Sequence, residues 1–152
     1  LLDVALRRRF WFVRCNPKRY VIEEEFFSEG EPSKMPTDKA EKTKWFALKL
    51  FDWLNGKGNE AGQLTNILGN DADELKIGHS YFLKLIRKDD YGNVIDPTFD
   101  DLRNIWFYSI VPLLEEYCGL DRKRLSEMLT LKGEDLSKVE KFNEDILTKK
   151  LK

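Results

Sequence analysis

Apolar positions recur through most of this chain at the spacing of three and four residues that amphipathic helices require. The clearest pattern predicts a helix over about Lys39–Leu54, in which Phe46 and Leu50 fall on one face. Asp38 precedes the pattern and is a plausible N-cap. Gly56 follows it, at a place where glycine commonly ends a helix. We therefore expect one long helix that packs its apolar face into a core.

A second long helix is predicted to begin at Thr98. Thr98 and Asp101 are spaced like a capping box, with Asp in place of the usual Glu. Apolar residues continue at helical spacing to Tyr117, and Gly119 ends the pattern. Pro112 lies inside this segment and is expected to kink the helix.

Weaker helical patterns occur elsewhere in the chain. They predict a short helix over Ala61–Leu68, a buried helix over Tyr81–Arg87 capped by Ser80, and charge-rich helices over Asp121–Leu129 and Val139–Leu147. The stretch "DYGNVIDP" (residues 90–97), which directly precedes Thr98, is typical of a turn. The pattern as a whole predicts a mainly α protein.

The first thirty residues differ from the rest by an abrupt change of charge. Leu1–Tyr20 carries six Arg and Lys residues against Asp3 alone, whereas Val21–Glu31 carries five Glu residues and no cation. The stretch "SEGEPSKMPTD", residues 28–38, is typical of a loop. We therefore expect a basic piece over residues 1–20, an acidic linker over residues 21–38, and a helical domain over residues 39–152.

Composition limits the class of protein. With 152 residues, 41% of them hydrophobic, and a net charge of -1, the chain can form one domain with a real core and is not an obvious nucleic-acid binder by charge. No apolar run approaches the roughly 18 residues of a membrane span, and no secretory signal is recognisable, so we expect a cytoplasmic protein. The opening "LLDV" lacks an initiator methionine, which suggests a piece of a longer protein.

The sequence predicts no metal site. Cys15 and Cys118 are far apart, and His79 is the single histidine, so no recognisable zinc spacing exists.

Three consecutive arginines, Arg7–Arg9, stand between apolar residues near the start of the chain. Taken alone, such a triplet is most often a solvated helix end, where cations oppose the negative pole of the helix dipole. It is also shorter than the basic runs of 5 to 8 residues that suggest nucleic-acid binding.

The order of three segments points to a family. "LDVALRRRF" (residues 2–10) resembles the segment of AAA+ ATPases in which a short helix ends in arginine before the last strand of the core, and "FWFVR" would be that strand. "IGHSYFLKLI" (residues 77–86) and "IWFYSIVPLLEEYCG" (residues 105–119) resemble stretches of the McrB family, the motor subunit of modified-cytosine restriction systems. Residues 120–152 resemble the family only loosely.

The resemblance implies a helical AAA+ lid, preceded by a helix end and one strand from the α/β nucleotide-binding core. It also implies a parent protein that hydrolyses GTP or ATP with Mg²⁺, forms rings with other copies, drives a McrC-like nuclease subunit and reaches DNA through other domains. The 152 residues contain no G-x-x-x-x-G-K-[ST] loop, so we expect no hydrolysis by this piece alone and no cofactor of its own.

In such a ring, the resemblance assigns the triplet a catalytic role. A guanidinium that reaches a neighbour's nucleotide can donate to the γ-phosphate oxygens, and such arginine fingers increase the rate by about 10³ to 10⁵. Arg8 and Arg9 are the better candidates, because they lie next to the predicted strand.

A second candidate site surrounds His79 and Ser80. In related AAA+ lids this helix start carries a "sensor 2" arginine that touches the nucleotide, but no arginine occurs between Gly78 and Phe82 here. His79 and Ser80 are therefore weaker candidates for nucleotide contact, and His79 could instead serve a structural role. The alternative for the whole chain is a helical interaction module, a regulator or adaptor whose arginines bind an acidic partner.

Overall fold

The computed structural model describes residues 16–69, 72 and 75–151. The helices of this part are α2 (Arg19–Phe26), α3 (Lys39–Asn55), α4 (Gln63–Leu68), α5 (His79–Leu83), α6 (Phe99–Ile105), the π-helix η2 (Trp106–Ile110), α7 (Val111–Tyr117), α8 (Arg122–Met128) and α9 (Glu144–Lys150). Antiparallel hairpins of two-residue strands join β1 (Gly56–Lys57) to β2 (Glu60–Ala61), β3 (Arg87–Lys88) to β4 (Val94–Ile95), and β5 (Thr130–Leu131) to β6 (Glu134–Asp135). The predicted mainly α fold is confirmed. The predicted core remnant, including the strand over residues 10–14, lies outside the described residues.

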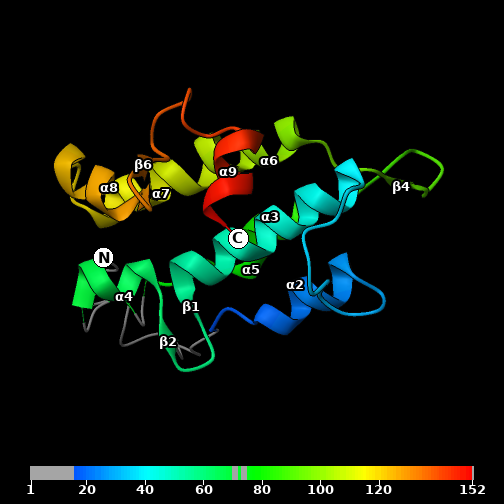
Figure 1. The fold of residues 1–152 in the computed structure, drawn as a ribbon, viewed down its shortest axis with the longest axis horizontal. Helices are drawn as coiled ribbons and strands as arrows, with labels where there is room; N and C mark the ends of the chain where they lie inside the picture. Colours follow the sequence, from blue (N-terminus) through cyan, green and yellow to red (C-terminus); the bar gives the residue numbers. More distant parts are fainter. Residues whose placement is uncertain (1–15, 70–71, 73–74, 152) are drawn as a thin grey trace, which may run out of the picture.

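Helix α3 is the centre of the fold. It crosses the middle of the molecule and contacts α2, α4, α5 and α6 (Figure 1). The predicted face is buried, since Phe46 and Leu50 have no solvent exposure. The predicted ends also hold, because the Asp38 side chain accepts the Glu41 N–H at 3.0 Å and Gly56 is the C-cap. Burial of this face against several helices at once contributes to the hydrophobic stabilisation of the fold.

The second predicted long helix is also present, as α6, η2 and α7 in succession. The Thr98 side chain accepts the Asp101 N–H, and the Asp101 side chain accepts the Thr98 N–H, so the capping box is complete. The turn before Pro112 widens into the π-helix, and the Val111 N–H donates to the Trp106 carbonyl five residues back. Proline has no N–H to donate and its ring crowds the carbonyl four residues earlier, and the wider turn relieves this clash.

The π-helix places Trp106 at the centre of an aromatic cluster. Its ring stacks on Phe142 with a centroid distance of 4.9 Å, and its Nε1–H donates to the Leu136 carbonyl at 2.8 Å. Phe142 also contacts Phe99 and Phe107. This cluster attaches the segment before α9 to the α6–η2 helix.

Two predicted helices have different bounds. The helix expected over Tyr81–Arg87 is α5, which begins at His79 after the N-cap Gly78, so Ser80 is not the cap. It ends at Leu83 because the next residues enter the β3–β4 hairpin. The helix expected over Val139–Leu147 corresponds to α9 and begins later, at Glu144. Asn143 is its N-cap, because the Asn143 side chain accepts the Ile146 N–H.

Helix α2 occupies part of the predicted linker. Its Ile22 and Phe26, four residues apart, are buried where α2 contacts α3 and α5. The glutamates around these two residues led to the prediction of a linker. In the structure, two buried apolar side chains are enough to hold one short helix on the core. Residues 19–26 therefore pack on the helical domain, and the domain boundaries at residues 20 and 38 stay predictions.

The β1–β2 hairpin depends on a close approach of two glycine backbones. A Cβ atom on Gly62 would lie 2.2 Å from the Gly56 nitrogen and 2.4 Å from the Leu54 oxygen. Gly58, at the turn of the same hairpin, has φ +60° and open space around it. The requirement for glycine is therefore steric at Gly62 and conformational at Gly58.

We predict that Gly62→Ala lowers the free energy of unfolding by about 3 kcal/mol or more, the upper end of the cost of overpacking, because the contacted atoms belong to the backbone and cannot rotate away. Gly58→Ala should cost only about 1 kcal/mol, the strain of a left-handed alanine. Urea unfolding followed by circular dichroism measures both values. Equal costs at the two positions would contradict this account of the hairpin.

Candidate functional site

The loop before α5 is held by a side chain that imitates strand pairing. The Asn55 Nδ2 group, at the end of α3, donates to the Ile77 carbonyl at 2.9 Å, and the Ile77 N–H donates to Asn55 Oδ1 at 2.8 Å. Both residues are buried, so these hydrogen bonds satisfy polar groups that water does not reach. The pair fixes the position from which Gly78, His79 and Ser80 follow.

His79 joins the start of α5 to the start of α2. The backbone N–H of Lys18, the N-cap residue of α2, donates to His79 Nδ1 at 3.3 Å. The Lys18 side chain makes no cap of its own, so the imidazole satisfies one of the free N–H groups at this helix end. His79 is half-buried and Ser80 is exposed. The site thus lies where the chain enters the helical domain.

The imidazole retains one polar atom for a ligand. Within the described part of the chain, the bond from Lys18 is the one hydrogen bond found for His79, which leaves Nε2 available. The exposed Ser80 hydroxyl is on the neighbouring residue, and the exposed Lys18 supplies a positive charge at the same junction. Donors and a cation of this kind fit the edge of an anionic group such as a phosphate. They are too few to cradle a whole triphosphate.

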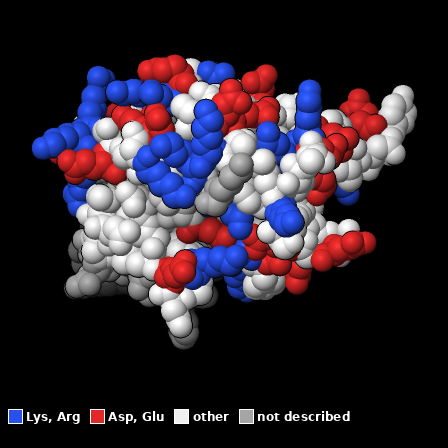
Figure 2. Space-filling view, viewed as in Figure 1, with Lys and Arg blue, Asp and Glu red and all other residues white. Residues whose placement is uncertain are grey.

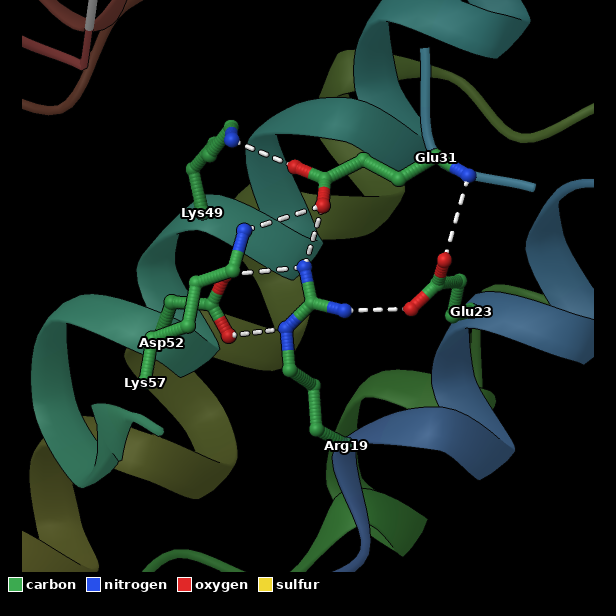
Figure 3. A network of polar contacts seen from close by, with 6 residues as sticks. All are labelled: Arg19, Glu23, Glu31, Lys49, Asp52 and Lys57. Atoms are coloured by element: carbon green, nitrogen blue, oxygen red, sulfur yellow. Dashed lines mark hydrogen bonds and ion pairs between the residues drawn. The ribbon is translucent and has the colours of Figure 1, made fainter. Parts of the chain in front are cut away.

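A closed network of charges holds α2 in place (Figure 3). The Arg19 guanidinium donates to both oxygens of Asp52 on α3, at 2.7 and 3.1 Å, and also to Glu23 and Glu31. Glu31 in turn accepts from Lys49 and, at 3.1 Å, from Lys57. The six residues carry three positive and three negative charges, so the partly buried network is balanced.

The network changes the acidity of its members. Burial by itself raises the pKa of Glu31, but the hydrogen bonds from Lys49, Lys57 and Arg19 outweigh it and lower the pKa from 4.5 to about 2. Burial raises the pKa of Asp52, although its hydrogen bonds with Arg19 act in the opposite direction. For Arg19, burial lowers the pKa, yet the hydrogen bonds with Asp52 and Glu31 more than reverse this and raise it. The folded protein therefore keeps Glu31 ionised well below the pH at which an ordinary glutamate takes up a proton.

Further observations concern the remaining candidate residues and the surface. Arg8 and Arg9 lie outside the described residues. Among the described residues, no group of three His, Cys, Asp or Glu side chains is arranged to hold a metal ion. None of the described helices has the length and apolar character to cross a membrane. On the face in Figure 2, cations and anions are interspersed over the upper half, and an uncharged area lies at the lower left.

The sequence reasoning missed the Asn55–Ile77 pair and the Arg19 network. Both join residues more than twenty positions apart, and a single sequence gives no signal that a given Asn or Arg has a distant partner. The local signal for the first of these contacts is the position of Asn55, a polar residue that follows Leu54 at the end of a periodic helix. A polar side chain at such a position, when buried, needs a hydrogen-bond partner.

A comparison with protein families identifies the type of helical domain to which this segment is similar. Residues 64–126 match the family model described as "McrB, alpha-helical lid domain". The predicted resemblance to the McrB lid is thereby confirmed over these residues. No curated protein and no solved structure matches the chain.

The folded unit extends beyond the matched residues. The match begins within α4 and ends within α8, whereas α3, which forms the centre of the core, precedes it and α9 follows it. Because α3 contacts α4, α5 and α6, the matched helices have no complete core without it. The structure therefore joins the lid segment to α2 and α3 as one packed body.

We predict that Glu31→Gln lowers the free energy of unfolding at pH 7 by roughly 1.5–3 kcal/mol, the usual contribution of charge-assisted hydrogen bonds. The loss should shrink as the pH falls from about 5 toward 2. The reason is that Glu31 takes up a proton near pH 4.5 in the unfolded chain but only near pH 2 in the folded protein, so its stabilisation is present above 4.5 and lost below.

Urea unfolding at several pH values, followed by tryptophan fluorescence, measures this difference. The matched control is Glu29→Gln, because Glu29 is exposed and belongs to the same loop. It should change the stability by less than about 0.5 kcal/mol at any pH. A loss for Glu31→Gln that stays constant between pH 6 and pH 2 would contradict the role given to the network.

Proposed function

We propose that this chain is the lid and arginine-finger portion of a McrB-type AAA+ NTPase, in which the lid closes over a GTP or ATP held with Mg²⁺ by the core domain. The observation that carries the proposal is the McrB lid match over residues 64–126, together with the position of His79 at the entry to the helical domain. In the parent protein, the core that precedes the lid supplies the phosphate-binding loop.

In this proposal His79 connects nucleotide contact to lid position. Its Nδ1 is held by the Lys18 N–H, so Nε2 has a fixed direction and can donate to a phosphate oxygen or accept from a sugar hydroxyl. A closed lid also excludes water, which strengthens the electrostatic contacts inside the site. Because α5 has five residues, its dipole adds little, and the side chains carry the contact.

Arg8 and Arg9 act in the neighbouring site. A finger in trans requires a ring of identical subunits, and the proposed hydrolysis in turn drives a McrC-like nuclease subunit, with DNA bound by other domains of the parent. The match to the McrB lid supports membership in such a system. Arginine suits this task because its planar fork can donate two N–H groups to one phosphate.

We predict that His79→Ala in the intact parent weakens nucleotide affinity by about tenfold, one charge-assisted hydrogen bond being worth about 1.5–3 kcal/mol. The measurement is a titration with a fluorescent nucleotide analogue, alongside the melting temperature.

Two further variants separate contact from structure. His79→Asn keeps an acceptor near the position of Nδ1 and should restore the melting temperature but not the affinity. His79→Gln places its polar end nearer the position of Nε2 and should restore part of the affinity. If Asn restores both properties, His79 has only the structural role.

We predict that Arg8→Ala or Arg9→Ala in the parent leaves nucleotide binding nearly intact, because the guanidinium serves the neighbour's site. Turnover should fall by roughly tenfold to a thousandfold, toward the lower end if the adjacent arginine partly substitutes. Steady-state phosphate release measures turnover, and nucleotide titration measures binding.

A mixture provides the sharper test. Rings that contain both an arginine variant and a variant lacking the P-loop lysine can pair a sound P-loop with a sound finger at some boundaries. Activity should partly return in the mixture when subunits exchange. Normal turnover in the single arginine variants would rule out the finger.

A further inference from the structure

The last turn of α3 carries two polar side chains that are almost buried. Asp52 and Asn55 lie three residues apart, so they project from the same side of the helix. The side chain of Asp52 is 10% exposed, and Asn55 is 9% exposed. Polar groups with so little access to water require hydrogen-bond partners, and the partners of both residues lie on other segments of the chain.

Each of these contacts anchors a different segment to the turn. Asp52 accepts two hydrogen bonds from the guanidinium of Arg19, at 2.7 and 3.1 Å, and Arg19 is the first residue of α2 (Figure 3). Asn55 exchanges two hydrogen bonds with the backbone of Ile77, at 2.9 and 2.8 Å, in the loop before α5. One turn of α3 therefore holds the start of α2 and the approach to α5 together.

The two anchored segments meet at His79. The backbone N–H of Lys18, one residue before Arg19, donates to His79 Nδ1 at 3.3 Å. On the other side of this hydrogen bond, His79 follows Ile77 by two residues. Each anchor thus lies within two residues of the contact, which leaves the backbone little freedom on either side. The direction of the imidazole depends on both anchors, because one anchor alone would fix only one partner of the hydrogen bond.

We propose that Asp52 and Asn55 are positioning residues for nucleotide binding, which hold His79 in place from the last turn of α3. The inference rests on the proposed function, in which His79 contacts the nucleotide. Both residues act through His79, because hydrogen bonds to Arg19 and Ile77 occupy their own polar atoms. A side chain that is already oriented loses less conformational freedom when it binds a ligand, so the loss of either anchor weakens binding.

The same turn of α3 supplies a matched control. Trp53 is next to Asp52 in the sequence, but its ring stacks on Trp106 of η2, at a centroid distance of 6.5 Å. Trp53→Leu removes this ring contact and should lower the melting temperature. It should leave the Lys18–His79 hydrogen bond and the nucleotide affinity unchanged, because neither anchor involves Trp53.

The first test measures the Lys18–His79 hydrogen bond in the 152-residue chain, without nucleotide. Hydrogen exchange of the Lys18 amide, followed by NMR, reports whether His79 still accepts this N–H. Asp52→Ala and Asn55→Ala should each accelerate the exchange by about fivefold, because amides near a helix end exchange through local opening. His79→Ala removes the acceptor and sets the upper limit of the effect. Trp53→Leu should leave the exchange unchanged.

The second test measures nucleotide affinity in the intact parent by titration with a fluorescent nucleotide analogue. Asp52→Ala and Asn55→Ala should each weaken the affinity by about threefold to tenfold, up to the loss expected for His79→Ala. In the His79→Ala background, the same two changes should weaken it by less than about twofold further, because the side chain that they position is absent. Circular dichroism verifies that every variant is folded.

Three results would overturn the proposal. They are Lys18 amide exchange that is unchanged in Asp52→Ala and Asn55→Ala, an affinity that is unchanged in both variants, and an affinity loss that is equally large with and without His79. The last result would show that the two residues act only on the fold.

Failure of the proposed function gives a different result, because His79→Ala by itself then leaves the affinity unchanged. The nucleotide role of Asp52 and Asn55 falls with it, whatever the exchange of the Lys18 amide shows. Failure of the positioning role alone leaves the effect of His79→Ala on affinity intact.

Discussion

The guanidinium of Arg19 is the contact on which the position of α2 depends. It bonds to carboxylates from three segments at once, namely Glu23 on α2 itself, Glu31 in the following loop and Asp52 on α3. A lysine could not do this, because its single ammonium group lacks the planar fork that reaches Asp52 with two N–H groups. The apolar anchors Ile22 and Phe26 supply the burial, and the guanidinium determines the orientation.

This orientation connects fold to function. With α2 fixed on α3, the Lys18 N–H meets His79, and the entry to the helical domain becomes part of a rigid body with the start of α5. In the proposed motor, movement of the lid would then be transmitted directly through α2 to the core. The Asn55–Ile77 pair also fixes the position of His79, because it holds the loop that directly precedes this residue.

The opposite side of α3 is organised by aromatic packing. Trp106 and Phe142 stack and draw the C-terminal segment onto the helix formed by α6 and η2. Pro112 contributes indirectly, because the π-helix that accommodates it sets the direction of Trp106 and leaves Tyr108 exposed. One side of α3 thus depends on charge and the other on ring contacts, although both rest on the same buried helix.

The sequence by itself determined the elements whose information is local. The periodic apolar face of α3, the Asp38 cap and the Thr98–Asp101 box each depend on residues within one or two turns, and short-range spacing is enough to specify them. The stretches around Ile77 and Ile105 likewise indicated the McrB lid.

Only the tertiary structure decided the rest. It showed that two buried apolar residues hold α2 on the core and that α9 begins after the N-cap Asn143. It also showed that Arg19 and His79 form hydrogen bonds with residues far away in the sequence. These contacts arise when separate helices pack together, and their partners are chosen by position in space. No local pattern in a single sequence records that choice.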